Sequence, residues 1–349
     1  VAMRLVLLLV ATALTAGQHV TLQNAVESGL KMPWIGLGTG GYGAKRLPAG
    51  EYPECWGETH GCGPDVVKAT REWLSLGGRR LDMANTYDSE ASVAQGLQES
   101  GVARSEVFVL EKIGPSQPLG YQDAHQQFND LLARTNFSYV DALLIHWPEV
   151  RPGETSLDPH CNMSAPDFSA KTCRLRTWKA LVEIHQSGRA RSIGVSNYNA
   201  THLQEIVESG MIMPSINQCP FHLYHSRAQQ DTIDFGRKHG VTFLAYSPLG
   251  IPDWHQFPKK SGMASTPLMD PVVTEIASNR SVTPAQVLLA WEWQLGIPMN
   301  PRTMNVAHMR DNLGALHTGR LSQREMNLLL SRHQDTCDED PTFYECMQA

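Results

Sequence analysis

The sequence predicts an α/β protein, a (β/α)8 (TIM) barrel with an N-terminal β-hairpin closing the barrel bottom. Short β-branched or apolar runs alternate eight times with longer amphipathic stretches over about 300 residues, a pattern typical of a parallel sheet with crossover helices. No linker, low-complexity segment or fixed-period repeat follows His19. With 42% apolar and 18% charged residues, the composition is that of an ordinary globular chain. We therefore expect a single domain over 18–349.

The expected elements follow one another as strand and helix. A hairpin (HVTL, then KMPW) leads into the first barrel strand, WIGLGT. The later strands are expected in RRLD, VFVLEK, DALLIHW, ARSIGVSN, SINQ, VTFLAYS and 298–302. The helices are expected in 65–76, EASVAQGLQES, AHQQFNDLLART, TWKALVEIHQSG, HLQEIVESG, QDTIDFGRKHG, TPAQVLLAWEWQLG and 306–316. Several of these helices stop at glycine, a usual C-terminal cap: Gly101, Gly188, Gly210, Gly240 and Gly296.

Two closures of such a sheet compete, a barrel and an open doubly wound sheet. A doubly wound dinucleotide domain carries G-x-G-x-x-G after its first strand. Here the first strand gives Gly36-Leu37-Gly38-Thr39-Gly40-Gly41, which has a different spacing and no helix directly after it. The barrel is therefore favoured.

The net charge and the hydropathy pattern limit which classes of partner and which cellular compartment we expect. The net charge of −6 argues against nucleic acid, which needs a clustered basic excess. The apolar run Leu5 to Ala16 is shorter than the ~20 residues of a membrane span. Preceded by Arg4 and followed by small residues, it predicts a signal peptide over 1–17, with cleavage after Ala13 or Gly17. The alternative is a buried N-terminal strand or helix.

The cysteines and sequons favour a secreted protein or one in the lumen of the secretory pathway. Six of the seven cysteines form close pairs: Cys55/Cys62, Cys161/Cys173 and Cys337/Cys346. Disulfides suit an oxidising compartment; other pairings and metal ligation are the alternatives, although no cysteine or histidine group has zinc spacing. The seventh, Cys219, lies in an apolar stretch, and we expect a buried free thiol. Glycosylation sequons occur at Asn136, Asn162, Asn199 and Asn279.

Polar groups gather at the expected C-terminal ends of the barrel strands, the end that carries function in this fold. Each has an ordinary structural explanation when taken alone, but seven such endings at one face are hard to attribute to packing. In chain order they are Asp82 with Tyr87, Lys112, His146-Trp147, Ser196-Asn197, Asn217-Gln218, Tyr246-Ser247 and Arg302-Thr303.

This set suits proton donation to a carbonyl group. A free phenol has a pKa near 10, and an adjacent ammonium is expected to bring that pKa toward neutrality. A carboxylate behind the lysine would keep it charged, and an imidazole would hydrogen-bond the substrate oxygen. No side chain supplies hydride, so a nicotinamide cofactor is required.

The chain resembles an aldo-keto reductase from about His19 to Leu330. The matching motifs, in the family's order, are GGRRLDMANTYDSE, DALLIHWP, SIGVSNYN, INQ, LAYSPLG, TPAQVLLAW and PRTMNVAHMRDNL. The resemblance implies that Tyr87 is the general acid, that Lys112 and Asp82 tune it, and that His146 orients the carbonyl.

The resemblance also implies a set of cofactor contacts. Ser196, Asn197 and Gln218 would hold the nicotinamide carboxamide, and Tyr246 would stack on the ring. Ser247 and Leu249 would line the pyrophosphate path. Arg302 and Thr303 stand where the family has Lys and Ser against the adenosine 2′-phosphate, and Asn312 would contact the adenine. His308 replaces the family's usual Arg at this phosphate, so NADPH is the expected cofactor and NADH remains possible.

Other departures concern the substrate pocket. Gly40 stands where many members have a substrate-contacting Trp, which would open one wall, while Trp147 remains as an aromatic wall. Glu111 replaces the family's usual Ser or Thr, and strand alternation turns it away from the barrel interior. The long loop Gly41 to Gly63 carries Tyr42 and Trp56, which we expect to shape substrate choice. The loop Val150 to Arg174 is also long, with Cys161/Cys173 as its expected staple.

The sequence thus predicts a monomeric NADPH-dependent carbonyl reductase that converts aldehydes or ketones to alcohols, with no metal, no nucleic acid partner and no membrane span. One alternative is a non-catalytic NADP(H)-binding or regulatory barrel subunit. Another is a secreted glycan hydrolase, but that chemistry needs paired carboxylates, and only Asp82 is acidic among the strand endings.

Overall fold

The computed structural model describes residues 19–25, 29–40, 63–114, 117–150, 155–224, 228–250 and 266–332. Its main sheet has eight strands in the order β10-β9-β8-β7-β6-β5-β4-β3, every neighbouring pair parallel. The strands are β3 Leu37–Gly38, β4 Arg80–Asp82, β5 Phe108–Ile113, β6 Ala142–Ile145, β7 Ile193–Ser196, β8 Ile216–Pro220, β9 Thr242–Tyr246 and β10 Met299–Asn300. All eight overlap the segments where the sequence predicts them, and β5 and β8 extend one and two residues beyond.

The first and last strands meet, so the sheet closes into a barrel. Ile35 forms a parallel bridge with Met299, and the amide of Gly36 donates to the Met299 carbonyl at 3.0 Å. The buried guanidinium of Arg80 spans the same seam, since its Nη2 donates to the Met299 carbonyl at 2.7 Å and its Nη1 to that of Pro33 at 2.6 Å. The predicted barrel is confirmed, and the open-sheet alternative is wrong.

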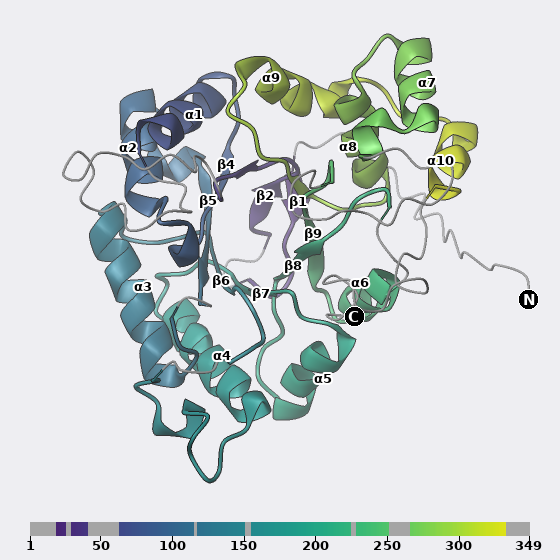
Figure 1. Cartoon of the computed structure of the whole chain (residues 1–349). Helices are drawn as coiled ribbons and strands as arrows, with labels where there is room; N and C mark the ends of the chain where they lie inside the picture. Colours follow the sequence, from purple (N-terminus) through teal and green to yellow (C-terminus); the bar gives the residue numbers. More distant parts are fainter. Residues whose placement is uncertain are drawn as a thin grey trace, which may run out of the picture.

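Helices surround the strands (Figure 1). Eight of them match the predicted segments: α1 Pro64–Ser75, α2 Glu90–Ser100, α3 Tyr121–Thr135, α4 Ala170–Gln186, α5 Ala200–Ser209, α6 Ala228–Lys238, α8 Pro284–Gln294 and α9 Val306–Gly314. The sequence analysis missed α7 Pro271–Arg280 and α10 Gln323–Leu330. Each is short, and each begins at a side-chain cap, Asp270 or Ser322.

The glycines expected to end helices have the predicted conformation. The φ values of Gly101, Gly188, Gly210, Gly240 and Gly296 lie between 71° and 78°. This left-handed region is open to glycine at little cost.

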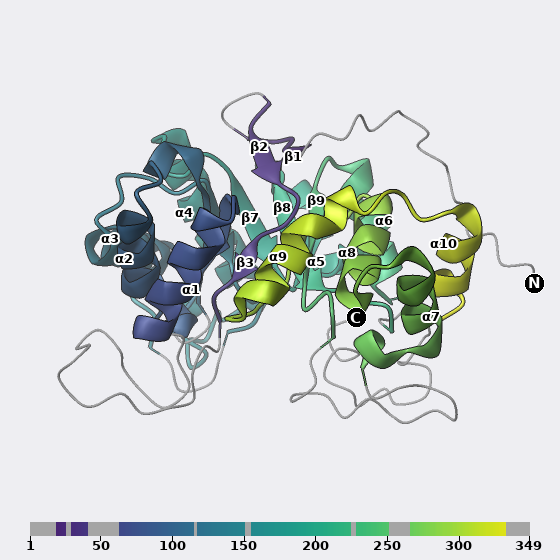
Figure 2. The same cartoon turned by 90° about the horizontal axis from the view of Figure 1, so that it is seen from above.

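A two-stranded antiparallel hairpin, β1 His19–Thr21 and β2 Lys31–Pro33, lies at one end of the barrel (Figure 2). Its apolar residues Leu22, Leu30 and Met32 form one buried cluster with strand residues Phe108, Leu110, Ala142, Leu144, Ile216 and Leu244. The hairpin therefore closes the barrel bottom, as predicted. The expected signal peptide lies outside the described residues, and no helix among the described residues is long and apolar enough to cross a membrane.

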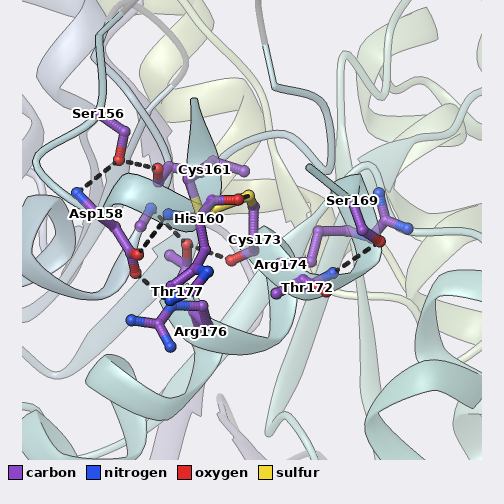
Figure 3. The surroundings of a disulfide bond; sticks show 12 residues. Ser156, Asp158, His160, Cys161, Ser169, Thr172, Cys173, Arg174, Arg176 and Thr177 are labelled. Atoms are coloured by element: carbon purple, nitrogen blue, oxygen red, sulfur yellow. Dashed lines mark hydrogen bonds and ion pairs between the residues drawn. A yellow bond between two sulfur atoms is a disulfide. The ribbon is translucent and has the colours of Figure 1, made fainter. Parts of the chain in front are cut away.

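One predicted disulfide falls within the described residues and is present (Figure 3). Cys161, in a short 3-10 turn, bonds to Cys173 in the first turn of α4, with their Cα atoms 5.2 Å apart. Beside it, the buried Asp158 caps that turn and accepts hydrogen bonds from Tyr121 N at 3.1 Å and Arg176 Nε at 2.5 Å. The disulfide thus fixes the loop after β6. The pairs Cys55/Cys62 and Cys337/Cys346 lie outside the described residues.

Candidate active site

The four residues predicted to act in proton transfer come from neighbouring strands. Asp82 ends β4, Lys112 lies in β5, His146 directly follows β6, and Tyr87 lies in the 3-10 turn Asn85–Tyr87. Because parallel strands end at the same rim, these side chains share one end of the barrel. The predicted grouping is therefore present in the fold.

Asp82 and Lys112 form a buried ion pair. Lys112 Nζ donates to Asp82 Oδ1 at 2.5 Å and to the carbonyl of Met83 at 2.7 Å, and its side chain is fully buried. The other carboxylate oxygen, Oδ2, accepts from Gln218 Nε2 at 2.6 Å and from Asn300 Nδ2 at 2.8 Å. Burial is the largest single effect and acts to lower the pKa of Lys112, but the charge and hydrogen bond of Asp82, together with Tyr87 and Glu111, outweigh it, so the pKa is raised. The lysine is held as a cation.

Tyr87 lies beside this pair. The Lys112 ammonium is 4.9 Å from the centroid of the Tyr87 ring. Burial raises the pKa of Tyr87 and Lys112 lowers it, with a net rise. The expected drop toward neutrality is therefore wrong, because desolvation of the phenolate outweighs the attraction of the cation. The phenol remains protonated at neutral pH and has a proton to donate.

His146 also packs against Tyr87. The two ring centroids are 5.5 Å apart in an edge-to-face arrangement. The hydroxyl of Thr86 lies 3.3 Å from His146 Nδ1, and donation from that hydroxyl favours the tautomer protonated on Nε2. Trp147 stacks on His146 with a centroid distance of 6.2 Å, so the predicted pocket residue Trp147 is adjacent to the site. Tyr42 and Trp56 lie outside the described residues.

The residues predicted to hold the nicotinamide form a connected chain across β7, β8 and β9. Ser196 Oγ donates to the Gln218 carbonyl at 2.8 Å, Asn197 Nδ2 to the His146 carbonyl at 2.9 Å, and Tyr246 Oη to Asn197 Oδ1 at 3.0 Å. Asn197 directly follows β7 and Ser247 directly follows β9. Their φ values are 62° and 55°, an uncommon conformation for residues other than glycine. These hydrogen bonds fix the rim next to His146.

The residues predicted to hold the adenosine end lie around the N-terminus of α9. Arg302 is exposed and its Nη1 donates to the Gly40 carbonyl at 2.9 Å. Thr303 Oγ1 accepts from the amide of Asn305, the residue that caps α9. His308 is exposed in the first turn, whereas Asn312 is buried and its Oδ1 has no hydrogen-bond partner among the described residues. Leu249 packs against the main core.

The structure corrects the expectation for Gly40. A Cβ atom at residue 40 would lie 2.9 Å from Cζ of Tyr87, closer than real Cβ contacts. The missing side chain therefore makes room for the Tyr87 ring itself, rather than opening a wall of the pocket.

Glu111 directly precedes Lys112 on β5 and is buried. Its Oε1 accepts from the Lys112 amide at 3.0 Å. Burial and the charge of Glu90 on α2 raise the pKa of Glu111.

The sequence analysis missed Thr86, Arg80 and Asn300. The only signal for Asn300 was an amide in an otherwise apolar strand run. The contact of Arg80 with Asn300, 2.9 Å from Nη2 to Oδ1, joins positions 220 residues apart and leaves no local pattern. Among the described residues, no group of His, Cys, Asp and Glu side chains has the arrangement of a metal site.

Comparison with known proteins agrees with this arrangement. The family model described as "Aldo/keto reductase family" matches residues 35–331. Morphine 6-dehydrogenase from Pseudomonas putida is 30% identical over 301 residues, which cover 86% of this chain and 88% of that protein. The 9,11-endoperoxide prostaglandin H2 reductase from Trypanosoma cruzi is 30% identical over 317 residues, covering 90% and 92%.

Solved structures show the same fold. An aldo/keto reductase from Brucella melitensis superposes with a TM-score of 0.70 at 25% identity, over 90% of this chain and 98% of that one. The aldose reductase from Schistosoma japonicum gives a TM-score of 0.71 at 24% identity, over 91% and 93%. The fold and site define an oxidoreductase built on a (β/α)8 barrel. The chain belongs to the aldo/keto reductase family.

Proposed function

We propose that this protein is an NADPH-dependent carbonyl reductase that converts a small aldehyde or ketone to the alcohol, with Tyr87 as the proton donor. The observation that carries the proposal is the buried Asp82–Lys112 pair, whose ammonium lies 4.9 Å from the centroid of the Tyr87 ring, with His146 packed edge-to-face against the same ring. A cation held beside a protonated phenol suits proton donation and stabilises the phenolate that remains.

The residues present fit a nicotinamide dinucleotide. Asn312 Oδ1 is a buried acceptor without a hydrogen-bond partner in the part of the chain that the structure describes, and an adenine amino group offers the matching donor. The guanidinium of Arg302 is exposed at the rim, where it suits a phosphate. Ser196, Asn197, Gln218 and Tyr246 would hold the nicotinamide end, and Ser247 and Leu249 would line the pyrophosphate path. Thr303 and His308 would lie beside Arg302 at the adenosine 2′-phosphate.

The mechanism follows from the geometry. The bound reduced cofactor supplies the hydride that the carbonyl carbon accepts. His146, protonated on Nε2, donates a hydrogen bond to the carbonyl oxygen and orients it beside Tyr87. Tyr87 gives its proton to that oxygen, which completes the alcohol. Lys112, kept charged by Asp82, stabilises the resulting phenolate until a proton returns to it. The ring of Trp147 provides an apolar wall for the substrate.

We also propose that the chain acts as a monomer in the lumen of the secretory pathway or outside the cell. The predicted signal peptide over 1–17 and the Cys161–Cys173 disulfide support this location. The sequon residues Asn136 and Asn279 are exposed. If the protein follows this route, treatment with a glycosidase that removes N-glycans lowers the mass of the secreted protein. Full-length protein without glycans in the cytosol would contradict it.

The decisive experiment measures oxidation of NADPH by the purified protein against a panel of aldehydes and ketones. Tyr87→Phe keeps the ring and removes the proton, and we expect a fall of at least about a hundredfold in kcat. Cofactor binding, followed by quenching of tryptophan fluorescence, should stay within about twofold of wild type, because the ring is retained. Equal turnover by both proteins would contradict the proposed acid.

A further inference from the structure

We infer that Asn300, oriented by Arg80, is a positioning residue that fixes the Asp82 carboxylate on Lys112. The inference rests on the proposed function, because it concerns the proton-donating group of that site. Asn300 lies on β10, the last strand of the barrel, and is 5% exposed. Its Oδ1 accepts from Arg80 Nη2 at 2.9 Å, and its Nδ2 donates to Asp82 Oδ2 at 2.8 Å.

Arg80 determines which way the amide points. A guanidinium offers donors only, so the amide oxygen must face it and the amide nitrogen must face Asp82. The guanidinium itself is anchored, because it also donates to the carbonyls of Pro33 and Met299. The orientation of Asn300 therefore follows from the closed seam of the barrel.

Gly36 provides the space for this contact. A Cβ atom at residue 36 would overlap both Nε of Arg80 and Oδ1 of Asn300. Three residues thus pack together at the seam: Gly36, Arg80 on β4 and Asn300 on β10. A substitution at any one of these positions must fit the space that the other two leave.

The effect on the active site follows from the hydrogen bonds of Asp82. Gln218 and Asn300 both donate to Oδ2, so Oδ1 is left to the Lys112 ammonium. Gln218 is also a proposed contact of the nicotinamide carboxamide. When the side-chain nitrogen of Gln218 turns to donate to the cofactor, it no longer donates to Asp82. Asn300 is then the donor that keeps the carboxylate plane, and with it Lys112, in place below Tyr87.

Two substitutions separate this role from a merely structural one. Asn300→Leu removes both hydrogen bonds. Asn300→Asp keeps an acceptor for Arg80 and loses the donor to Asp82 until the introduced carboxyl is protonated. The control is Asn217→Leu on β8: Asn217 is also buried, and its Nδ2 donates to the Tyr198 carbonyl at 2.7 Å rather than to Asp82.

We expect both Asn300 variants to lower kcat about tenfold, the effect of one hydrogen bond to a charged group, with KM for NADPH within about twofold of wild type. Asn217→Leu should keep the wild-type kcat even if it melts at a lower temperature.

The carboxyl introduced in Asn300→Asp is surrounded by charged and titratable groups. They are Arg80 and Asp82 on β4, Lys112 on β5 and, on the paired strand β9, Tyr246. As pH falls and this carboxyl gains a proton, the activity of Asn300→Asp relative to wild type should recover.

A second readout needs no turnover. In cofactor-free protein labelled with 13C at tyrosine Cζ, the Tyr87 signal, assigned with Tyr87→Phe, should titrate at higher pH in Asn300→Leu than in wild type. Folded Asn300 variants with wild-type kcat and an unchanged Tyr87 titration would overturn the inference, as would an equal loss in Asn217→Leu. If Asn300→Leu does not fold, Asn300→Asp decides. If the wild-type protein shows no turnover, the proposed function is contradicted. The Tyr87 titration then tests the positioning role of Asn300 by itself.

Discussion

The backbone of Gly40 lies against the ring of Tyr87, with space for a hydrogen but not for a methyl group. The carbonyl of the same glycine accepts a hydrogen bond from Arg302. One small residue thus connects the proposed proton donor with the proposed phosphate-binding arginine.

Gly40→Ala should lower kcat about tenfold, because the added methyl must displace the Tyr87 ring from His146 and Lys112. Steady-state kinetics with one good aldehyde substrate measures this. Gly236→Ala in α6 is a matched control, since a Cβ there makes only ordinary contacts of 3.4 Å or more. An active Gly40→Ala enzyme would show that the ring has room to move.

Lys112→Met should shift the pH profile of alcohol oxidation to higher pH. Lys112 is the group that lowers the pKa of Tyr87, whereas burial raises it. Without the cation, burial and the charges of Asp82 and Glu111 remain and all raise the pKa of Tyr87. The pKa therefore rises further, and the phenolate that accepts the proton in oxidation forms only at higher pH. Lys112→Arg retains a charge and should shift the profile less. Identical profiles for Lys112→Met and wild type would exclude Lys112 as the tuning group.

Arg302→Ala should raise KM for NADPH about tenfold and leave KM for NADH nearly unchanged. Only NADPH carries the 2′-phosphate, and a guanidinium binds phosphate through charge-assisted hydrogen bonds. Arg324→Ala, an exposed arginine on α10, removes the same charge elsewhere and serves as the control. Equal losses with the two cofactors would place Arg302 away from the phosphate.

Glu292→Gln should flatten the dependence of stability on pH. Glu292 on α8 is fully buried, neither of its carboxyl oxygens has a hydrogen-bond partner within the described ranges of the chain, and burial raises its pKa well above the ordinary value. The folded state thus binds a proton that the unfolded state releases. Above the ordinary glutamate pKa, the free energy of unfolding therefore falls by about 1.4 kcal/mol per pH unit, until the folded-state pKa is reached. Urea unfolding at several pH values measures the slope. Glu275→Gln, an exposed position on α7, should leave that slope intact.

Removal of the Cys161–Cys173 disulfide should lower the free energy of unfolding by about 3 kcal/mol, from the closure of a short loop. The two cysteines are 12 residues apart. The double substitution of both cysteines to Ala, compared with Cys219→Ala, tests this by thermal unfolding. Cys219 is a buried free thiol whose pKa is raised to about 12 by burial, so its loss removes no cross-link. A disulfide variant as stable as wild type would mean that the Asp158 and Arg176 contacts alone hold the loop.

Most of the fold and the center of the site could be predicted from the sequence because both depend on local patterns. The strands and eight helices follow from hydrophobic periodicity, and Asp82, Lys112 and His146 lie at or just after strand ends. The net effect on Tyr87 could not be predicted, since it is a balance between burial and charge that needs coordinates. The contacts of Gly40 with Tyr87 and of Arg80 with Asn300 join distant parts of the chain, and no local spacing reveals them. The helices α7 and α10 were not predicted because each is short. Although each begins at a capping side chain, its short apolar face gives only a weak periodic signal.

The hairpin under the barrel also affects the kinetics. With Leu22, Leu30 and Met32 filling the base, reactants and products must share the opposite mouth. A long dinucleotide and a small carbonyl compound cannot pass each other freely in one entrance. The partner that lies deeper must arrive first and depart last, so product-inhibition patterns should reveal a compulsory sequence of binding rather than a random one.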